Sequence, residues 1–168
     1  MLLTIFLSLI VCVAATVMMV SAVAFIQKRE MFSSAPKEVF AIIKPREKEL
    51  FCGARNIGWV LMGSSLLMIL GVFVIGIWDG FRSGFTFLQF LLRFLIIFTV
   101  YKLYDMTYFD YFFLLRFGFF QYYYPEANGL MDGRKYGFNI KSQLLKLLVI
   151  FPGISALIAW VCSIIART

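Results

Sequence analysis

The sequence predicts an all-α integral membrane protein, a four-transmembrane-helix bundle. The 168-residue chain is 62% hydrophobic and its mean hydropathy is +0.89, which is more apolar surface than a soluble domain of this length can bury. A spanning helix needs about 20 mostly apolar residues. Four stretches meet that need, at residues 2–26, 57–78, 83–104 and 144–166. They belong to a single polytopic membrane domain, residues 1–168.

The basic side chains are concentrated in alternate connecting segments. Lys and Arg are frequent in residues 27–56 and 105–143, whereas the short link 79–82 and the C-terminal end carry one each. Positive residues mark cytoplasmic loops. We therefore expect a multi-pass protein of the cell (inner) membrane, with both termini extracytoplasmic and both long loops cytoplasmic. The net charge of +7 then reflects these loops and anionic headgroups rather than nucleic acid.

The first span is uninterrupted by Pro or Gly. Because no positive charge precedes its apolar core, we expect a retained helix and not a cleaved signal. One stripe at spacing four permits close helix approach and predicts a packing face; it consists of Ala14, Met18 and Ala22.

The first long loop contains signals for two further helices. Ser33–Glu38 combines hydroxyl caps with Pro and Glu in a first turn, and Val39–Ile43 is mostly apolar. This pattern predicts a short amphipathic helix in the membrane interface. Pro45 is expected to begin a second helix, with Arg46–Glu49 as its first turn, that runs into the second span.

The second span is rich in small residues and ends at Trp78 and Phe81, which suit an outer aromatic belt. Small residues let helices approach closely in lipid. Packing is the expected role, with a substrate path as the alternative. These residues are Gly58, Gly63, Ser64, Ser65, Gly71 and Gly76.

The third span leads into an aromatic-rich extension that reaches Tyr124, and no Pro occurs between Phe81 and Tyr124. Two courses are open for residues 105–124. The segment continues as one long helix beyond the membrane, or it bends along the inner interface, where Tyr and Phe are favoured.

The fourth span is expected to begin at a cap, Asn139 or Ser142, and to kink at Pro152-Gly153. It also carries a small-residue stripe that predicts a packing face. The stripe consists of Ser155, Ala159 and Ser163.

The candidate functional residues are a polar cluster in and after the third span. A charge near a helix centre costs roughly 2.5–3.5 kcal/mol on insertion scales, so Arg93 must bond carbonyls of a neighbouring helix, bond Gln89, or serve a function. Lys102 and Asp105 are three apart and can pair on one helix face. Asp110 points about 140° away from Asp105 if the segment is α-helical. Ion binding or proton relay is the alternative to interfacial pairing. The cluster comprises Arg93, Lys102, Asp105 and Asp110.

Catalytic and cofactor signatures are missing. The chain has no His, which is the usual general base near pH 7 and the commonest metal ligand. Its three Cys are far apart and form no CxxC. We therefore expect no catalytic residues, no metal and no cofactor, and lean against an enzyme.

One enzyme pattern is similar in outline. Lipid-synthesising alcohol phosphotransferases gather four acids around metal ions, starting from an Asp-Gly pair, as in Asp79-Gly80 with Asp105 and Asp110. The spacing differs, because Arg82 is too close to Asp79. The predicted topology also puts Asp79 on the opposite side of the membrane from the other two acids.

Short segments resemble uncharacterised small bacterial four-span integral membrane proteins. They are Ala35–Glu38, Tyr104–Asp105 with Asp110, Pro125–Glu126, and Phe138–Lys141, where Phe138-Asn139 replaces an aromatic-histidine step. The resemblance implies the four-span topology and no activity.

These observations favour a non-enzymatic subunit or scaffold that binds another membrane protein, itself or lipid. The alternatives are a transport or ion-coupling protein that uses Arg93, Asp105 and Asp110, and a lipid-modifying membrane enzyme. Membrane lipid, and a membrane-protein partner or a second copy, are the expected partners; nucleic acid is not.

Overall fold

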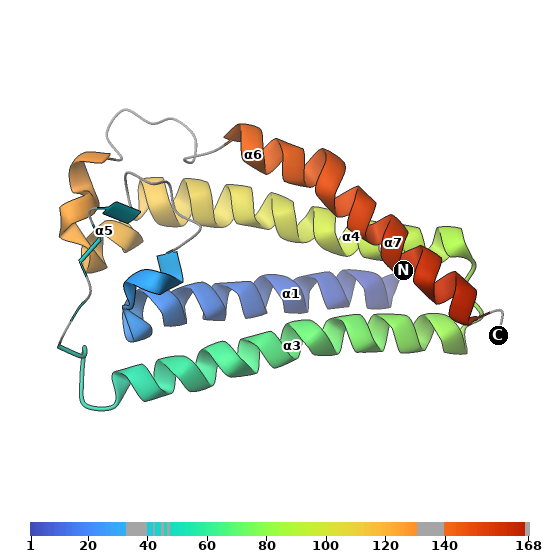
Figure 1. Cartoon of the computed structure of the whole chain (residues 1–168), viewed down its shortest axis with the longest axis horizontal. Coiled ribbons are helices and arrows are strands. Elements are labelled where there is room, and N and C mark those ends of the chain that lie inside the picture. Colours follow the sequence, from blue (N-terminus) through green and yellow to red (C-terminus); the bar gives the residue numbers. More distant parts are fainter. Residues whose placement is uncertain (33–39, 42, 45, 47, 131–139, 167–168) are drawn as a thin grey trace. The chain divides into compact units, whose positions relative to one another are not determined.

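A computed structural model describes residues 1–32, 40–41, 43–44, 46, 48–130 and 140–166, and all regular structure in them is helical. Four helices are long and apolar enough to cross a membrane, so the predicted all-α class and four spans are confirmed (Figure 1). The second and fourth are longer than predicted, and the third reaches further into the aromatic extension. The helices are Leu2–Ile26, Ala54–Arg82, Phe87–Phe113 and Lys141–Ile165.

The chain forms two compact units. The first, which we name the bundle unit, comprises Met1–Ala14, Leu67–Asp105 and Lys141–Thr168. The second, the loop unit, comprises Ala15–Leu66 and Met106–Ile140. Each unit has a hydrophobic core of its own.

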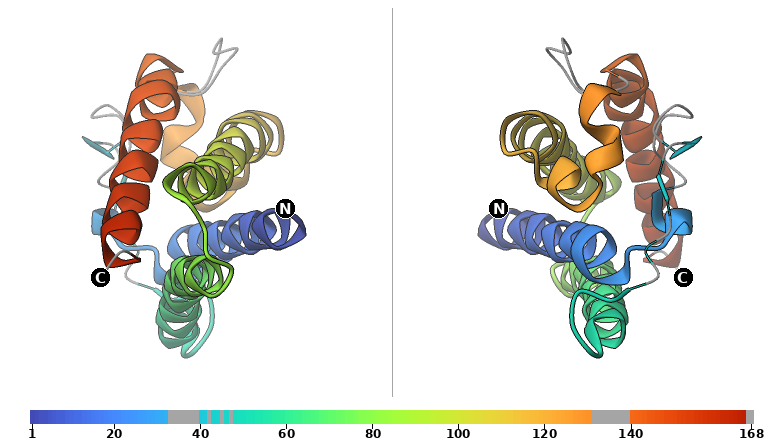
Figure 2. Two further views of the ribbon diagram at one scale, coloured as in Figure 1. Left: turned by 90° about the vertical axis from the view of Figure 1, so that its right-hand side faces the viewer. Right: turned by 90° about the vertical axis from the view of Figure 1, so that its left-hand side faces the viewer.

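The bundle unit contains parts of all four spans, contributed by α1 (Leu2–Val20), α3 (Ala54–Arg82), α4 (Phe87–Tyr104) and α7 (Phe151–Ile165). Phe90, Phe94 and Ile97 of α4 are fully buried in its core, together with side chains from the other three helices. Figure 2 shows α4 and α7 side by side, and these two helices are in contact. This unit is therefore a four-helix bundle.

A tight turn connects α3 to α4. The side chain of Gln89 accepts a 2.8 Å hydrogen bond from the backbone N–H of Thr86, which caps the start of α4. Gly80 permits the close approach of the two helices, because a Cβ there would lie 2.2 Å from the ring of Phe90. A larger residue at position 80 would push the hairpin apart.

The fourth span has a helix-packing face, as predicted, but one residue of the predicted stripe does not belong to it. Ser155 and Ala159 are fully buried, but the third buried residue is Cys162 and not Ser163. At 100° per residue, the seventh residue after Ser155 stays on its stripe, whereas the eighth lies about 80° away.

The irregularity predicted around Pro152 takes the form of a π segment. Residues Lys146–Ile150 (η5) have π hydrogen bonding between α6 (Ile140–Leu145) and α7. Pro152 lacks an N–H, and its ring crowds the carbonyl four residues earlier, at Leu148 within this segment. The predicted caps are not confirmed: Asn139 lies outside the described residues, and Ser142 lies inside α6.

The small-residue stripe of α1 is only partly buried. Ala14 is buried, whereas Met18 and Ala22 are half-buried. Residues Ser21–Ile26 (η1) form a π-helix, in which a spacing of four no longer follows one face. The π-helix ends at Gln27, which has φ 53°.

The aromatic extension continues the third span as a helix for part of its length and then breaks. Residues Asp105–Arg116 (η3) continue α4 directly as a π-helix. The helix then breaks at Gly118, whose φ of 57° is accessible to glycine at little cost. A short helix, α5 (Phe119–Tyr123), and a 3-10 turn, η4 (Pro125–Leu130), follow it.

The first long loop differs from its prediction. Most of the predicted interfacial segment, and Pro45, lie outside the described residues. Arg46 and residues 48–53 are not helical, and α3 begins at Ala54 after a short 3-10 turn, η2 (Arg29–Phe32), earlier in the loop. Gly53 has φ +85° and donates its N–H to the carboxylate of Glu49 at 2.9 Å, which ends the loop.

Candidate functional site

Arg93 is buried in the bundle unit and its charge is matched within the chain. Its side chain is 4% exposed. One terminal nitrogen donates to the carbonyl of Gly76 at 2.7 Å, and the other donates to the carboxylate of Asp79 at 2.7 Å. The guanidinium also lies 4.2 Å from the ring centroid of Phe85. The predicted bond to a neighbouring-helix carbonyl is present, whereas Gln89 caps α4 instead.

Asp79 is the residue that the sequence interpretation missed here. It lies one turn before the end of α3, and its side chain is 29% exposed. A hairpin that turns at residues 83–86 places Arg93 opposite residue 76, so hairpin register alone does not pair it with Asp79. The interpretation had assigned Asp79 to the outer boundary and therefore did not pair it with a residue of the third span.

Lys102 and Asp105 form the ion pair that their spacing predicts. Lys102 is buried, its ammonium group donates to the carboxylate of Asp105, and both residues belong to the bundle unit. Each of the two buried cations of α4 is thus neutralised by one acid. Such pairing lowers the cost of holding a charge in the membrane.

Asp110 is half-buried in η3 and belongs to the loop unit. The expected 140° angle to Asp105 assumed an α-helix. That angle does not apply in the π-helical segment, where the hydrogen bonds run from residue i to i+5.

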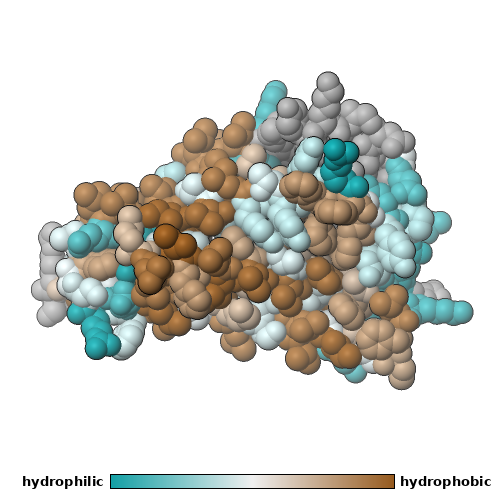
Figure 3. All heavy atoms as spheres, turned by 180° about the vertical axis from the view of Figure 1, so that it is seen from behind, coloured by the Kyte–Doolittle hydropathy of each residue, from teal (hydrophilic) through white to brown (hydrophobic). Residues whose placement is uncertain are grey.

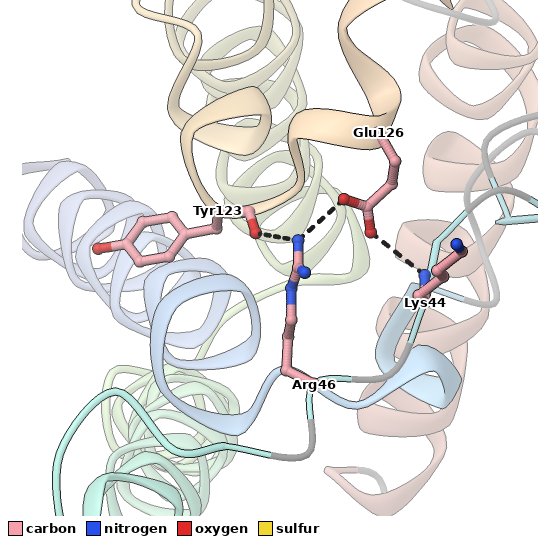
Figure 4. Close-up of polar contacts among 4 residues, drawn as sticks. All are labelled: Lys44, Arg46, Tyr123 and Glu126. Carbon is pink, nitrogen blue, oxygen red and sulfur yellow. Dashed lines mark hydrogen bonds and ion pairs between the residues drawn. The ribbon is translucent and has the colours of Figure 1, made fainter.

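A second polar group lies in the loop unit and joins the two long loops (Figure 4). The guanidinium of Arg46 donates to the carboxylate of Glu126 at 2.8 Å and to the carbonyl of Tyr123 at 3.0 Å. The other carboxylate oxygen of Glu126 accepts the backbone N–H of Lys44 at 3.3 Å. Glu126 thus holds two points of the first loop. The sequence interpretation treated Arg46 as part of a solvated helical turn and did not identify this group.

Tyr124 lies beneath this group. Its side chain is fully buried, and the guanidinium of Arg46 is 5.4 Å from its ring centroid. Burial raises the pKa of Tyr124 to about 12; Arg46 lowers this pKa and Glu126 raises it to a smaller extent. The phenol is therefore neutral at physiological pH, and the anionic partner of Arg46 is Glu126.

The geometry is that of structural charge pairing. Within the described residues, no group of three or more His, Cys, Asp and Glu side chains is placed to hold a metal ion. The acids Asp79, Asp105 and Glu126 each engage a basic partner. No protein-family model, curated protein or solved structure matches the chain.

Proposed function

We propose that the protein is a non-enzymatic membrane subunit or scaffold that binds a second transmembrane helix, either of another membrane protein or of a second copy. The support comes from α3. In the bundle unit, this helix presents exposed apolar side chains, among them Leu67, Val74 and Trp78. Figure 3 shows apolar side chains over much of one face of the molecule.

The observation that carries the proposal is that α3 contains glycines which its packing within the chain does not require. Gly80 of α3 must be small, because a Cβ there would lie 2.2 Å from the ring of Phe90, whereas a Cβ at Gly76 would make ordinary contacts at 3.6 Å with Leu7 and Phe94. A Cβ at Gly71, or at Gly63 in the loop unit, would meet nothing within 4 Å. Contact with lipid alone does not require glycine, whereas a second helix packed closely against α3 does.

The pairing of the membrane charges argues against the transport alternative. A carrier of ions needs charged groups that can exchange partners with its cargo. Arg93 and Lys102 are instead buried beside their own acids, and Asp105 is held by Lys102. These groups support the helices themselves, so they give no support to transport or to a lipid-modifying reaction.

The test is Gly71→Leu, examined by native mass spectrometry of the protein extracted in lipid nanodiscs. We expect the wild type to carry a stoichiometric second chain and the variant to lose it while keeping its helicity, since the space around Gly71 is open. The same loss is expected for Gly63→Leu.

Two control variants complete this test. Gly153→Leu makes the same substitution in equally open surroundings on α7 and is expected to keep the partner. Gly80→Leu is expected to disrupt the α3–α4 hairpin itself, because of Phe90. A wild type found only as a monomer, or a Gly71→Leu variant that retains its partner, would contradict the proposal.

We also propose the inner membrane as the location, with both termini extracytoplasmic and loops 27–56 and 105–143 in the cytoplasm. The charge distribution supports this orientation. The hydrogen bond between Arg46 and Glu126 supports one feature of this topology, the location of both loops on the same side of the membrane. It joins residues of the two loops that are 80 positions apart in the chain. Two spans separate the loops, as that requires.

A further inference from the structure

The short helix α5 has a buried side and an exposed aromatic side. Phe120 and Tyr124 are buried, and their rings are stacked with centroids 5.1 Å apart. They share a core with Val23 of η1 and with Ile43. The side chains of Tyr122, in α5, and of Phe117, which precedes the helix, are 78% and 71% exposed. These are large aromatic groups that the fold of the loop unit does not cover.

α5 packs against the ends of two apolar helices. The ring of Phe119, the first residue of α5, lies 4.8 Å from that of Phe113, the last residue of the third span. The helix also packs on η1, which contains Val23 and closes the first span. Since α5 contacts the ends of two helices that are long and apolar enough to cross a membrane, its expected level is the membrane boundary.

The chain is held at this level by aromatic contacts across the break at Gly118. The ring of Phe113 contacts Tyr108 at 5.0 Å on one side and Phe119 on the other. The ring of Phe119 contacts that of Tyr123 at 5.2 Å. These edge-to-face contacts stabilise the return of α5 against η3.

The chemistry of the exposed side matches the headgroup region of a bilayer. Phenyl rings and phenols are favoured at that boundary, where a ring contacts acyl chains and a hydroxyl reaches headgroups. An exposed basic side chain lies next to them in the chain, since Arg116 directly precedes Phe117. Basic groups at this level attract anionic lipid by about 1 kcal/mol each.

We infer that α5 and its flanking turn, residues 116–124, are a membrane-interface anchor whose exposed aromatic side is immersed in the headgroup region of an anionic phospholipid leaflet. Phe117 and Tyr122 insert beside the acyl chains, and Arg116 binds lipid phosphate. This surface is distinct from the face of α3, and the inference does not rest on the proposed function.

The test uses nitroxide labels and their collision rates with oxygen and with a water-soluble nickel chelate. Cys52 is exposed and is replaced by Ser, whereas Cys12 and Cys162 are buried and remain. Labels are then attached in Tyr122→Cys, in Val13→Cys as a lipid-facing reference, and in Lys48→Cys as a water-facing reference. The full chain is studied in nanodiscs that contain phosphatidylcholine and phosphatidylglycerol.

At Tyr122→Cys we expect a ratio of oxygen to nickel collisions several-fold above that at Lys48→Cys. A ratio equal to that at Lys48→Cys would overturn the inference, because the surface would then face water. Protection from both reagents would also overturn it, since protein would then cover the surface. Phe117→Cys, read in the same way, guards against a local effect of the label.

The anionic part of the inference is tested separately. Removing phosphatidylglycerol is expected to lower the ratio at Tyr122→Cys, and Arg116→Gln is expected to abolish that difference. An identical ratio in both lipid mixtures would overturn the role of Arg116. Loss of partner binding in Gly71→Leu leaves these labels unaffected, so failure of the proposed function and failure of this inference are distinguishable.

Discussion

At the scale of single residues, Arg93 shows how a charge is held inside a membrane helix. It is 4% exposed, whereas its partner Asp79 is 29% exposed. Two of its nitrogens are hydrogen-bonded, to Gly76 and Asp79, and its Nε has no bonded partner. The fixed fork of a guanidinium can bond a carbonyl and a carboxylate at once. Arg93 thereby links α4 to two turns of α3.

The unequal exposure of this pair predicts unequal effects of its two single substitutions. Asp79→Leu leaves a buried guanidinium without its acid and is expected to lower the free energy of unfolding by about 1–3 kcal/mol, below the usual range for fully buried pairs because Asp79 is partly exposed. Arg93→Leu leaves an acid that can turn toward water and is expected to cost less.

Unfolding in mixed detergent micelles, with all four members of a double-mutant cycle, measures this difference. The double variant, Asp79→Leu with Arg93→Leu, is expected to be more stable than Asp79→Leu alone. If Arg93→Leu proved the more damaging single change, the pairing described here would not explain the stability of the hairpin.

At the scale of elements, π hydrogen bonding is the main departure from the pattern of the sequence. It occurs in η1, η3 and η5, at the ends of the first, third and fourth spans that adjoin the long loops. A π turn is wider than an α turn, so stripes counted at 100° per residue lose their register. That is why Ala22 leaves the predicted packing stripe and why the predicted angle of Asp110 does not apply.

Gly118 ends the longest of these segments and gives a test at this scale. Its φ of 57° lies in the left-handed region, which costs a residue with a Cβ roughly 1–2 kcal/mol. Gly118→Ala is therefore expected to lower the free energy of unfolding by about 1 kcal/mol. Chemical denaturation in micelles measures this loss.

Gly129→Ala is the matched control for that experiment. Gly129 is exposed, a Cβ there meets nothing within 4 Å, and it is not among the residues with positive φ. The control is expected to change stability by less than about 0.5 kcal/mol. Equal losses in both variants would show that the backbone conformation of Gly118 is not the cause.

At the scale of the whole molecule, the arrangement of the loops across the membrane can be tested by labelling single introduced cysteines. Cys52 is the exposed cysteine of the three, so Cys52→Ser removes background labelling. In that variant, Lys48→Cys is expected to react with a membrane-impermeant maleimide only after the cells are permeabilised. Ser83→Cys, in the exposed turn between α3 and α4, is expected to react in intact cells. The reverse pattern would invert the proposed topology.

The sequence by itself determined the all-α class and the four spans, because membrane insertion depends on the composition of each segment. It also predicted the pair of Lys102 and Asp105, since a spacing of three is sufficient for contact on a helix. Only the tertiary structure decided that Arg93 pairs with Asp79, that Arg46 binds Glu126 across 80 residues, and that Cys162 replaces Ser163 in the packing face. Those outcomes depend on how helices and loops approach one another and on the phase of each helix, which local composition does not specify.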